Sequence, residues 1–337
     1  MDYLPQLIQI AQDAGADVVG VAPIALFKDF PMQENPIYMM PEAKSLIVLG
    51  HRTMRGSYRG TEEGTFLGHY ATMGTTYIQQ DIVPFTARAV SIFIEDRGYE
   101  AMPIGNHFGW AAMDDYGEMK RHYSVPARLG GPLPDVRLDL NKAACLAGLG
   151  ELGYSGRVLN PIYGPRLVFG CVLTEMELPS SPMVAPGTVC TGCKKCATEC
   201  PGACISADET ENVRLGDYVY TVGKYDLKRC EIARTGSEIT DDGSYKPNKY
   251  SPFCEKPLKN SWFASGNICA GHGCQRACFM ELEEKKRITN LFDTPFRRHA
   301  PWEINWEDWR SGKLVNDTGL PNANVTETAK NIIDIDE

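Results

Sequence analysis

The chain has 337 residues, which is enough for one large domain or two ordinary ones. Its residues are 43% hydrophobic and 23% charged, as in ordinary globular proteins, and its net charge of −9 argues against nucleic acid or an anionic membrane as the main partner. The N-terminal residues do not form a secretory signal, and no apolar run approaches the length that spans a bilayer. The sequence therefore predicts a cytoplasmic protein without a membrane partner.

The first part of the chain carries the elements of a layered α/β domain, which we place over residues 1–180. Apolar residues at helical spacing predict a helix over 4–15, and apolar runs predict buried strands over 18–22 and 45–49. A longer helix is predicted over 76–97, where Pro84 should kink the helix or mark a break. The sequence then predicts a long loop region over 108–137, a short helix over 141–147 and a buried strand over 166–174.

The twelve cysteines are concentrated in the second part of the chain, since ten of them lie between residues 190 and 278. In a cytosolic chain of this size, cysteines are more often metal ligands than disulfide partners. Prolines gather near residue 180, where the composition changes. We therefore place a domain boundary there, and predict a tail over 291–337 that packs back on the body through its tryptophans and is loose at its end.

The strongest motif is CTGCKKCATECP, which has the form Cys-x2-Cys-x2-Cys-x3-Cys-Pro and starts at Cys190. This spacing aims three thiolates at one cubane cluster, while the fourth cysteine, Cys200, serves the other cluster of a pair. Structural zinc sites use two paired ligand groups, which this spacing does not match. The motif therefore predicts a ferredoxin-like module with two four-iron four-sulfur clusters over residues 181–290.

The segment CAGHGCQRAC supplies further ligands, and by the crossing rule its last cysteine returns to the first cluster. The predicted ligands of the first cluster are Cys190, Cys193, Cys196 and Cys278. The predicted ligands of the second cluster are Cys200, Cys269, Cys274 and either Cys230 or Cys254. Cys204 is predicted to be packed core.

A glycine-rich run precedes the cysteine motif and has two interpretations. Its glycines are Gly148, Gly150, Gly153 and Gly156. They remove side chains either where the backbone approaches a flat ligand or phosphate closely, or where a helix, a turn and a strand cross tightly.

The run AGLGELGYSGRVLNPIYGPRLVFGCVLTEMEL at 147–178, which leads into VCTGCKKCATECP, resembles the core of corrinoid-dependent reductive dehalogenases. The same layout is found in epoxyqueuosine reductases, whose N-terminal part is similar to AQDAGADVVGVAP and PEAKSLIVLG in this chain. The resemblance covers roughly residues 5–300. It implies an α+β sandwich with a nitroreductase-like core and a cobalamin, without its lower axial base, between this core and the ferredoxin-like module. It also favours Cys230, in its Arg-Cys context, as the last ligand of the second cluster.

The resemblance further implies which residues serve the cobalamin and the reaction. The four glycines would face the corrinoid, and a turn with Asn160, Tyr163, Gly164 and Arg166 would hold its amides.

A tyrosine donates the proton in this family, and Tyr77 is its best match, with Tyr70 as an alternative. Asn106 resembles an asparagine that lines the same pocket. Tyr154 stands where the family has a basic residue, and Arg157 could take over its role.

Together these features predict a reductive dehalogenase-like iron–sulfur reductase that depends on cobalamin. An external donor such as ferredoxin or flavodoxin would supply electrons through the two clusters to cobalt, which cleaves a small organic substrate, and Tyr77 or Tyr154 would supply the proton. One alternative is a cobalamin-handling protein without an organic substrate. Others are an epoxyqueuosine reductase-like enzyme that modifies tRNA and an electron carrier with a corrin-free, flavin-like domain.

Overall fold

A computed structural model describes residues 3–63, 66, 68–105, 125–134, 136–235, 237–239, 245–247, 269 and 273–296. Its centre is a four-stranded antiparallel sheet in the order β1-β2-β6-β3. The strands are β1 (Val18–Pro23), β2 (Ser45–Arg52), β3 (Ala101–Ile104) and β6 (Leu167–Thr174). The sequence and the structure thus agree on a mixed α/β fold.

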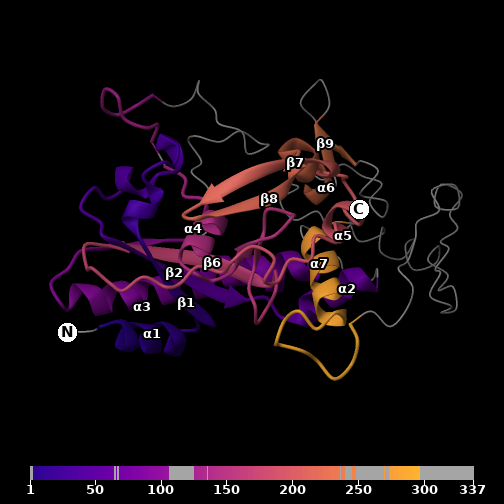
Figure 1. Ribbon diagram of the computed structural model, residues 1–337, viewed down its shortest axis with the longest axis horizontal. Helices are drawn as coiled ribbons and strands as arrows, with labels where there is room; N and C mark the ends of the chain where they lie inside the picture. The colour runs from indigo at the N-terminus through magenta and orange to yellow at the C-terminus, as the bar shows by residue number, and fades with distance from the viewer. Residues whose placement is uncertain are drawn as a thin grey trace, which may run out of the picture.

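Both faces of this sheet are buried, because side chains along each strand alternate between two apolar layers. Helices α1 (Leu4–Asp13) and α3 (Val83–Glu95) cover the face that includes Ile47 of β2. Helix α4 (Leu140–Leu146) covers the opposite face, which includes the neighbouring Val48. Figure 1 shows the two helices and α4 on opposite sides of the sheet.

The other elements lie around this core. The described helices and strands not yet named are α2 (Arg59–Glu62), β4 (Glu151–Leu152), β5 (Val158–Leu159), α5 (Lys195–Thr198), β7 (Ile205–Leu215), β8 (Tyr218–Tyr225), α6 (Leu227–Thr235), β9 (Ser237–Ile239), β10 (Tyr245–Pro247) and α7 (Gly273–Glu284). Short 3₁₀ segments are η1 (Ile24–Phe27), η2 (Met32–Glu34), η3 (Pro36–Tyr38) and η4 (Arg55–Tyr58), and π-helical segments are η5 (Tyr70–Thr76) and η6 (Ile78–Ile82).

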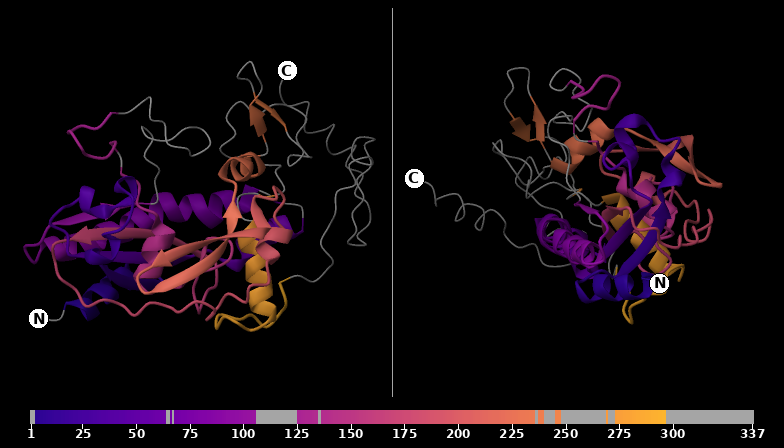
Figure 2. Two further views of the ribbon diagram at one scale, coloured as in Figure 1. Left: turned by 45° about the horizontal axis from the view of Figure 1, so that its top comes forward. Right: turned by 90° about the vertical axis from the view of Figure 1, so that its left-hand side faces the viewer.

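The hairpin of β7 and β8 packs on the α4 side of the sheet, as the views in Figure 2 show. Its residues Tyr220 and Val222 are buried in the same apolar cluster as Leu146 of α4. The two domains predicted on either side of residue 180 therefore share apolar core, and the boundary itself stays a prediction.

Most predicted elements of the first part are confirmed. The helices over 4–15 and 141–147 and the strands over 18–22, 45–49 and 166–174 all form, with ends that differ by a few residues. No helix in the described part of the chain has the length and apolar character needed to cross a membrane. Asn106, Cys254 and residues 297–337 lie outside the described residues, so the predictions for them stay predictions.

The helix predicted over 76–97 is α-helical only in its second half. Pro84 lies in the first turn of α3, and the preceding segments η5 and η6 are π-helical. Proline lacks an N–H and its ring clashes with the carbonyl four residues earlier, so regular α-helical bonds cannot continue through it. Pro84 therefore lies where the backbone changes from π-helical to α-helical, and the chain stays helical on both sides of it, so the predicted break does not occur.

His51 is a buried histidine on β2 that makes the fold sensitive to acid. Its Nε2 lies 3.1 Å from Thr86 Oγ1 on α3. Burial lowers the pKa of His51 to about 4 from its ordinary 6.5, although Asp17 and the backbone of Val168 act in the opposite direction. The unfolded chain therefore takes up this proton at higher pH than the folded chain does, and stability is lost as the pH falls from 6.5 towards 4.

When the pH is lowered from about 7.5 to about 5, we expect the free energy of unfolding of the native chain to fall by roughly 2 kcal/mol because of His51. In His51→Gln the loss over this interval should be smaller by about that amount, because glutamine does not titrate and can still bond to Thr86. Urea unfolding of both chains at the two pH values measures the difference. Equal losses in both chains would contradict the role of His51.

Candidate metal centre

The first three cysteines of the motif lie on a tight turn that leads into α5. Gly192, with φ of +67°, and Lys194, with φ of +59°, both adopt the left-handed conformation. These two reversals curl the backbone between Cys190 and Cys196. The local sequence therefore brings three thiols to one side of the turn.

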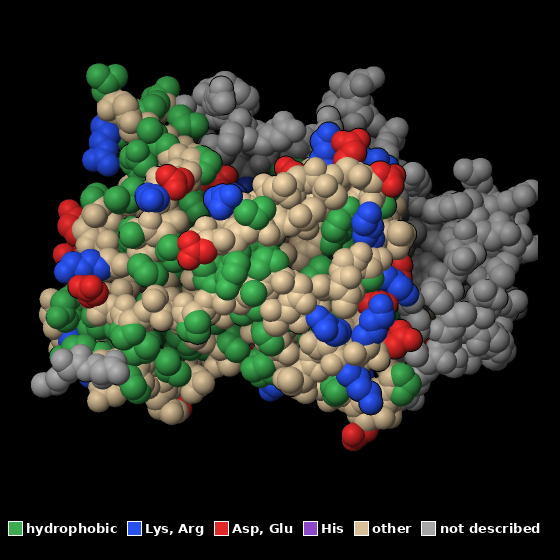
Figure 3. All heavy atoms as spheres, in the orientation of Figure 1, with side chains coloured by type: hydrophobic (Ala, Val, Ile, Leu, Met, Phe, Trp, Pro, Cys, Tyr) green, Lys and Arg blue, Asp and Glu red, His purple; other side chains and the backbone are tan. Residues whose placement is uncertain are grey.

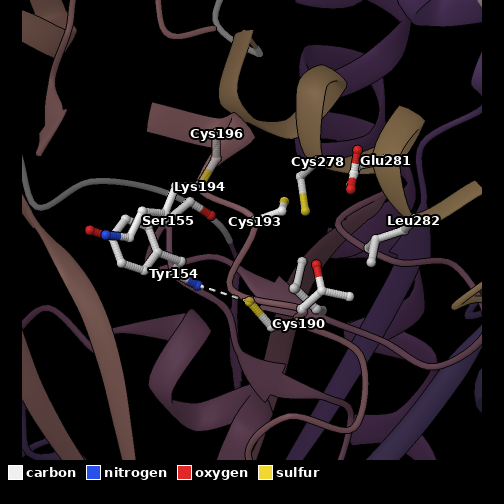
Figure 4. Close-up of a pocket in the computed structure, with 11 residues that line it drawn as sticks. Tyr154, Ser155, Cys190, Cys193, Lys194, Cys196, Cys278, Glu281 and Leu282 are labelled. Atoms are coloured by element: carbon white, nitrogen blue, oxygen red, sulfur yellow. Dashed lines mark hydrogen bonds between the residues drawn. The ribbon is translucent and has the colours of Figure 1, made fainter. Parts of the chain in front are cut away.

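Cys278 on α7 completes this first thiol set from a distant part of the chain. The four thiols of Cys190, Cys193, Cys196 and Cys278 line one cavity. Figure 4 shows their sulfur atoms around this space. A cubane cluster takes four thiolates, and this donor set fits it. Within the described residues, no three His, Cys, Asp or Glu side chains converge as a single metal ion would require.

Tyr154 forms a wall of the same cavity. Its backbone N–H donates to Cys190 Sγ at 3.5 Å, and its hydroxyl donates to the carbonyl oxygen of Ser206 at 2.8 Å. Lys194 Nζ lies 5.5 Å from the centroid of its ring. The structure thus places Tyr154 at the first thiol set with its hydroxyl bonded to the backbone, and its role as a proton donor stays a prediction.

Glu151 on β4 holds the chain just before the first cysteine. It is only 1% exposed, and its carboxylate accepts hydrogen bonds from the backbone N–H groups of Gly187, Val189 and Cys190. The bonds from Gly187 and Cys190 measure 2.6 Å. The sequence interpretation missed this residue. The sequence feature that could have identified Glu151 is its position as a single acidic residue in an otherwise apolar, glycine-rich segment.

A second group of thiols lies where the motif ends. This second thiol group consists of Cys200, Cys204, Cys230, Cys269 and Cys274. Burial raises the pKa of Cys274 and Arg157 lowers it, while the nearby thiols of Cys230 and Cys200 raise it further. The predicted ligands Cys200, Cys230, Cys269 and Cys274 are therefore neighbours in the structure.

Arg157 lies partly buried beside the second thiol group, immediately before β5. Burial lowers its pKa, but Cys274, Tyr225 and Tyr70 raise it, and the net direction is upward. Among the described residues, no carboxylate forms an ion pair with this guanidinium. Whether Arg157 faces the interior was left open by the sequence, and the structure places it next to thiols.

The two tyrosines considered as proton donors have different surroundings. Tyr77 is 45% exposed, whereas Tyr70 is 4% exposed and its ring stacks on Tyr58 at 5.2 Å. The Tyr70 hydroxyl donates to Gln275 Oε1 at 2.5 Å. Since Gln275 follows Cys274 on α7, the structure brings Tyr70 to the second thiol group and leaves Tyr77 at the surface.

Two polar residues predicted to hold the corrinoid bond to the chain itself. Asn160 Nδ2 donates to the carbonyl oxygen of Leu149 at 2.7 Å. Arg166 is fully buried and donates to the carbonyl oxygen of Thr53 at 3.0 Å and to Asn290 Oδ1. These bonds fix the turn and the start of β6, so any contact of Asn160 or Arg166 with a ligand stays a prediction.

The chain's own atoms fill the space at three of the four glycines of the run. A Cβ added at Gly148, Gly150 or Gly153 would lie 2.3 to 2.5 Å from another atom of the chain. Tight internal packing therefore requires glycine at these three positions. At Gly156, with φ of +71°, no atom lies within 4 Å of the added Cβ, so this turn is open.

No family model matches the chain, but curated proteins do. It is 28% identical over 279 residues to a tetrachloroethene reductive dehalogenase of Dehalobacter restrictus, which covers 82% of this chain and 39% of that protein. It is 28% identical over 214 residues to the enzyme of the same name from Desulfitobacterium hafniense, and this match covers 63% of this chain and 31% of that protein. An epoxyqueuosine reductase of Synechococcus sp. is 26% identical over 133 residues, and this match covers 36% of this chain and 40% of that protein. The chain thus spans about two fifths or less of these relatives.

Solved structures give similarities of the same kind. A catabolic reductive dehalogenase in complex with 3-bromo-4-hydroxybenzoic acid aligns with 94% of this chain and 41% of its own, at a TM-score of 0.47 and 16% identity. An epoxyqueuosine reductase with a tRNA stem loop aligns with 71% of this chain and 59% of its own, at a TM-score of 0.45 and 15% identity.

The expectation that nucleic acid is an improbable partner is not borne out. An epoxyqueuosine reductase is among the sequence relatives. On the face shown in Figure 3, Lys and Arg side chains lie interspersed with Asp and Glu. The net charge of −9 is a property of the whole chain and does not describe each face.

Proposed function

We propose that this chain, which its sequence similarities place in the superfamily of reductive dehalogenases and epoxyqueuosine reductases, is an oxidoreductase with two four-iron four-sulfur clusters. The observation that carries the proposal is the cavity lined by three thiols of the motif and by Cys278 from α7. The proposal includes a nitroreductase-like core, a ferredoxin-like module over 181–290 and a cytoplasmic location.

When bound, the clusters supply a one-electron path from an external donor such as ferredoxin or flavodoxin. Cys193 is exposed, so the first thiol set defines the side from which a donor protein can approach. Cys274 and Cys278 stand one helical turn apart on α7 and belong to different sets. Helix α7 therefore holds the two sets at a fixed spacing.

The residues beside the second thiol group suit a corrinoid, which is the cofactor that the resemblance implies. When bound, it would supply the metal centre for reductive cleavage of a carbon–halogen or similar bond. Gly156 offers an open turn, and the neighbouring Arg157 offers a guanidinium without a carboxylate partner in the described part of the chain. A guanidinium binds amide carbonyls and phosphate groups, both of which a cobalamin carries at its edge.

The buried Tyr70 is the candidate proton donor that lies beside the second thiol group. Its hydroxyl is fixed by Gln275, and the Arg157 guanidinium is near enough to act on its pKa. Burial raises the pKa of Tyr70 and Arg157 works against that rise, so the phenol keeps its proton at neutral pH. Tyr70 is therefore a further candidate beside Tyr77 and Tyr154, and a bound cofactor or substrate that adds positive charge would make it a stronger acid.

Anaerobic reconstitution with iron, sulfide and cobalamin tests the proposal. We expect about eight iron and about eight sulfide per chain, and cobalamin that stays bound during gel filtration. The loaded chain, given a low-potential reductant, should then reduce halogenated organic compounds. Turnover of an epoxyqueuosine-modified tRNA stem loop instead would favour the tRNA-modifying alternative. Transfer of cobalamin to an acceptor without any turnover would favour a cobalamin-handling protein, and a chain without iron would end the proposal.

Arg157 should set the reduction potential of the second cluster, because reduction adds negative charge beside a cation. In Arg157→Gln we expect this potential to fall by roughly 50 to 100 mV, which corresponds to about 1 to 2 kcal/mol of lost attraction. Arg157→Lys keeps the charge and should change it less. Redox titration followed by electron paramagnetic resonance (EPR) measures both clusters. Equal shifts in the two clusters would contradict the local placement of Arg157.

A further inference from the structure

The second thiol group contains five thiols, which is one more than a cubane cluster binds. The additional thiol is Cys204, which lies four residues after Cys200 and is 2% exposed. The sequence predicts it to be packed core. It is indeed buried, but its neighbours include the thiols of Cys200 and Cys230.

A strained turn directs Cys204 back towards Cys200. Ala203 has φ of +47°, a left-handed conformation that alanine rarely adopts. In this turn the Ala203 N–H donates to the carbonyl oxygen of Cys200 at 2.9 Å. The Cys204 N–H donates to Cys200 Sγ at 3.4 Å. The turn therefore sets residue 204 against a predicted cluster ligand.

The backbone also ties Cys204 to the helix that carries Cys230. The carbonyl oxygen of Cys204 accepts a hydrogen bond from the Asp226 N–H at 2.8 Å, and the Cys230 N–H donates to the carbonyl oxygen of Asp226 at 3.1 Å. A Cβ at Gly202 would lie 2.4 Å from Cys204 Sγ, so the missing side chain leaves room for this sulfur. Cys204 consequently packs in one small cluster with Cys200 and Cys230.

We propose that Cys204 is an alternative ligand of the second cluster and can take the coordination position of Cys230. The inference rests on the proposed clusters. In the exchange, the iron–sulfur bond to Cys230 breaks and a bond to Cys204 forms. The proton of the Cys204 thiol passes to the Cys230 sulfur, so the electron count and the total charge stay the same. Both thiols belong to the same small cluster of the fold.

Four variants of the full chain test the inference: Cys204→Ala, Cys230→Ala, the double variant, and Cys269→Ala as a control for ligand loss. Each is reconstituted anaerobically, and iron, sulfide and the EPR spectrum after reduction are measured. Each single variant at 204 or 230 should keep about eight iron, because the other thiol remains. The double variant and Cys269→Ala should fall towards about four and lose the signal of the second cluster.

Loss of the second cluster in Cys230→Ala alone would overturn the inference, since Cys204 would then fail to replace it. Retention of about eight iron in the double variant would overturn it as well, because another ligand would be serving that position. Cys230→Ala removes a single half-buried thiol, so its loss of the second cluster would count against the inference even where the double variant does not fold. A native chain that binds no iron would instead reject the proposed function.

Discussion

Cys278→Ala is expected to remove the first cluster and to leave the second one in place. Cys278 shares a cavity with the three motif thiols, while Cys274, one turn earlier on α7, belongs to the second thiol group. The neighbouring Phe279 is fully buried, so α7 should stay anchored when the Cys278 thiol is removed. Iron should fall from about eight towards about four per chain.

The spectrum identifies which cluster is lost. The EPR signal that remains in reduced Cys278→Ala should match that of Cys193→Ala and differ from that of Cys269→Ala. Cys145→Ala is the matched control, because Cys145 is a buried cysteine of α4 outside both thiol groups, and this variant should keep both signals. A Cys278→Ala spectrum that matches Cys269→Ala would contradict the assignment of Cys278 to the first set.

The thiol sets could be predicted from the sequence because cluster ligation requires a characteristic spacing of cysteines within one short segment. Three cysteines separated by two residues each must share one tight turn, and the known crossing between paired clusters brings in the last cysteine of the second segment. The strands could be predicted for a similar reason. A short apolar run such as 45–49, between polar and turn residues, has few alternatives to a buried strand.

The neighbours of the predicted catalytic residues could not be predicted from local sequence spacing. Arg157 is close enough to Tyr70, Cys230 and Cys274 for their charges to act on its pKa, and these residues come from three distant segments that only tertiary packing brings together. The choice between Tyr70 and Tyr77 depends on a helical period, and η5 and η6 are π-helical. A π turn holds more residues than an α turn, so the face that each side chain occupies differs from the α-helical expectation.

The interpretation of the glycine run illustrates the same limit. Glycine spacing shows where side chains are excluded but does not show what excludes them. At Gly148 and Gly150 the excluding atoms are the chain's own carbonyl oxygens, from Pro182 and Leu159. At Gly156 nothing in the chain fills the space, and only there does the ligand interpretation retain an open site.

Glu151→Ala is expected to destabilise the fold and to weaken retention of the first cluster. The substitution leaves three backbone N–H groups without their acceptor. The N–H of Val189 is buried, whereas Cys190 is half-buried and Gly187 is exposed to water. A buried unsatisfied group costs about 1 to 3 kcal/mol and a hydrated one costs less, so the free energy of unfolding should fall by roughly 2 kcal/mol. Cys190 is itself a predicted ligand, so the first cluster should be lost faster to an iron chelator.

Urea unfolding and the rate of iron loss to the chelator, followed by the EPR signal of each cluster, measure the two effects. Glu151→Gln keeps one acceptor oxygen and should be intermediate, because its amide group faces the remaining donors. Glu95→Ala, which removes an exposed carboxylate at the end of α3, should change the unfolding free energy by no more than about 0.5 kcal/mol. If Glu151→Ala retained the first cluster as long as the native chain does, the carboxylate would not be what fixes Cys190 in position.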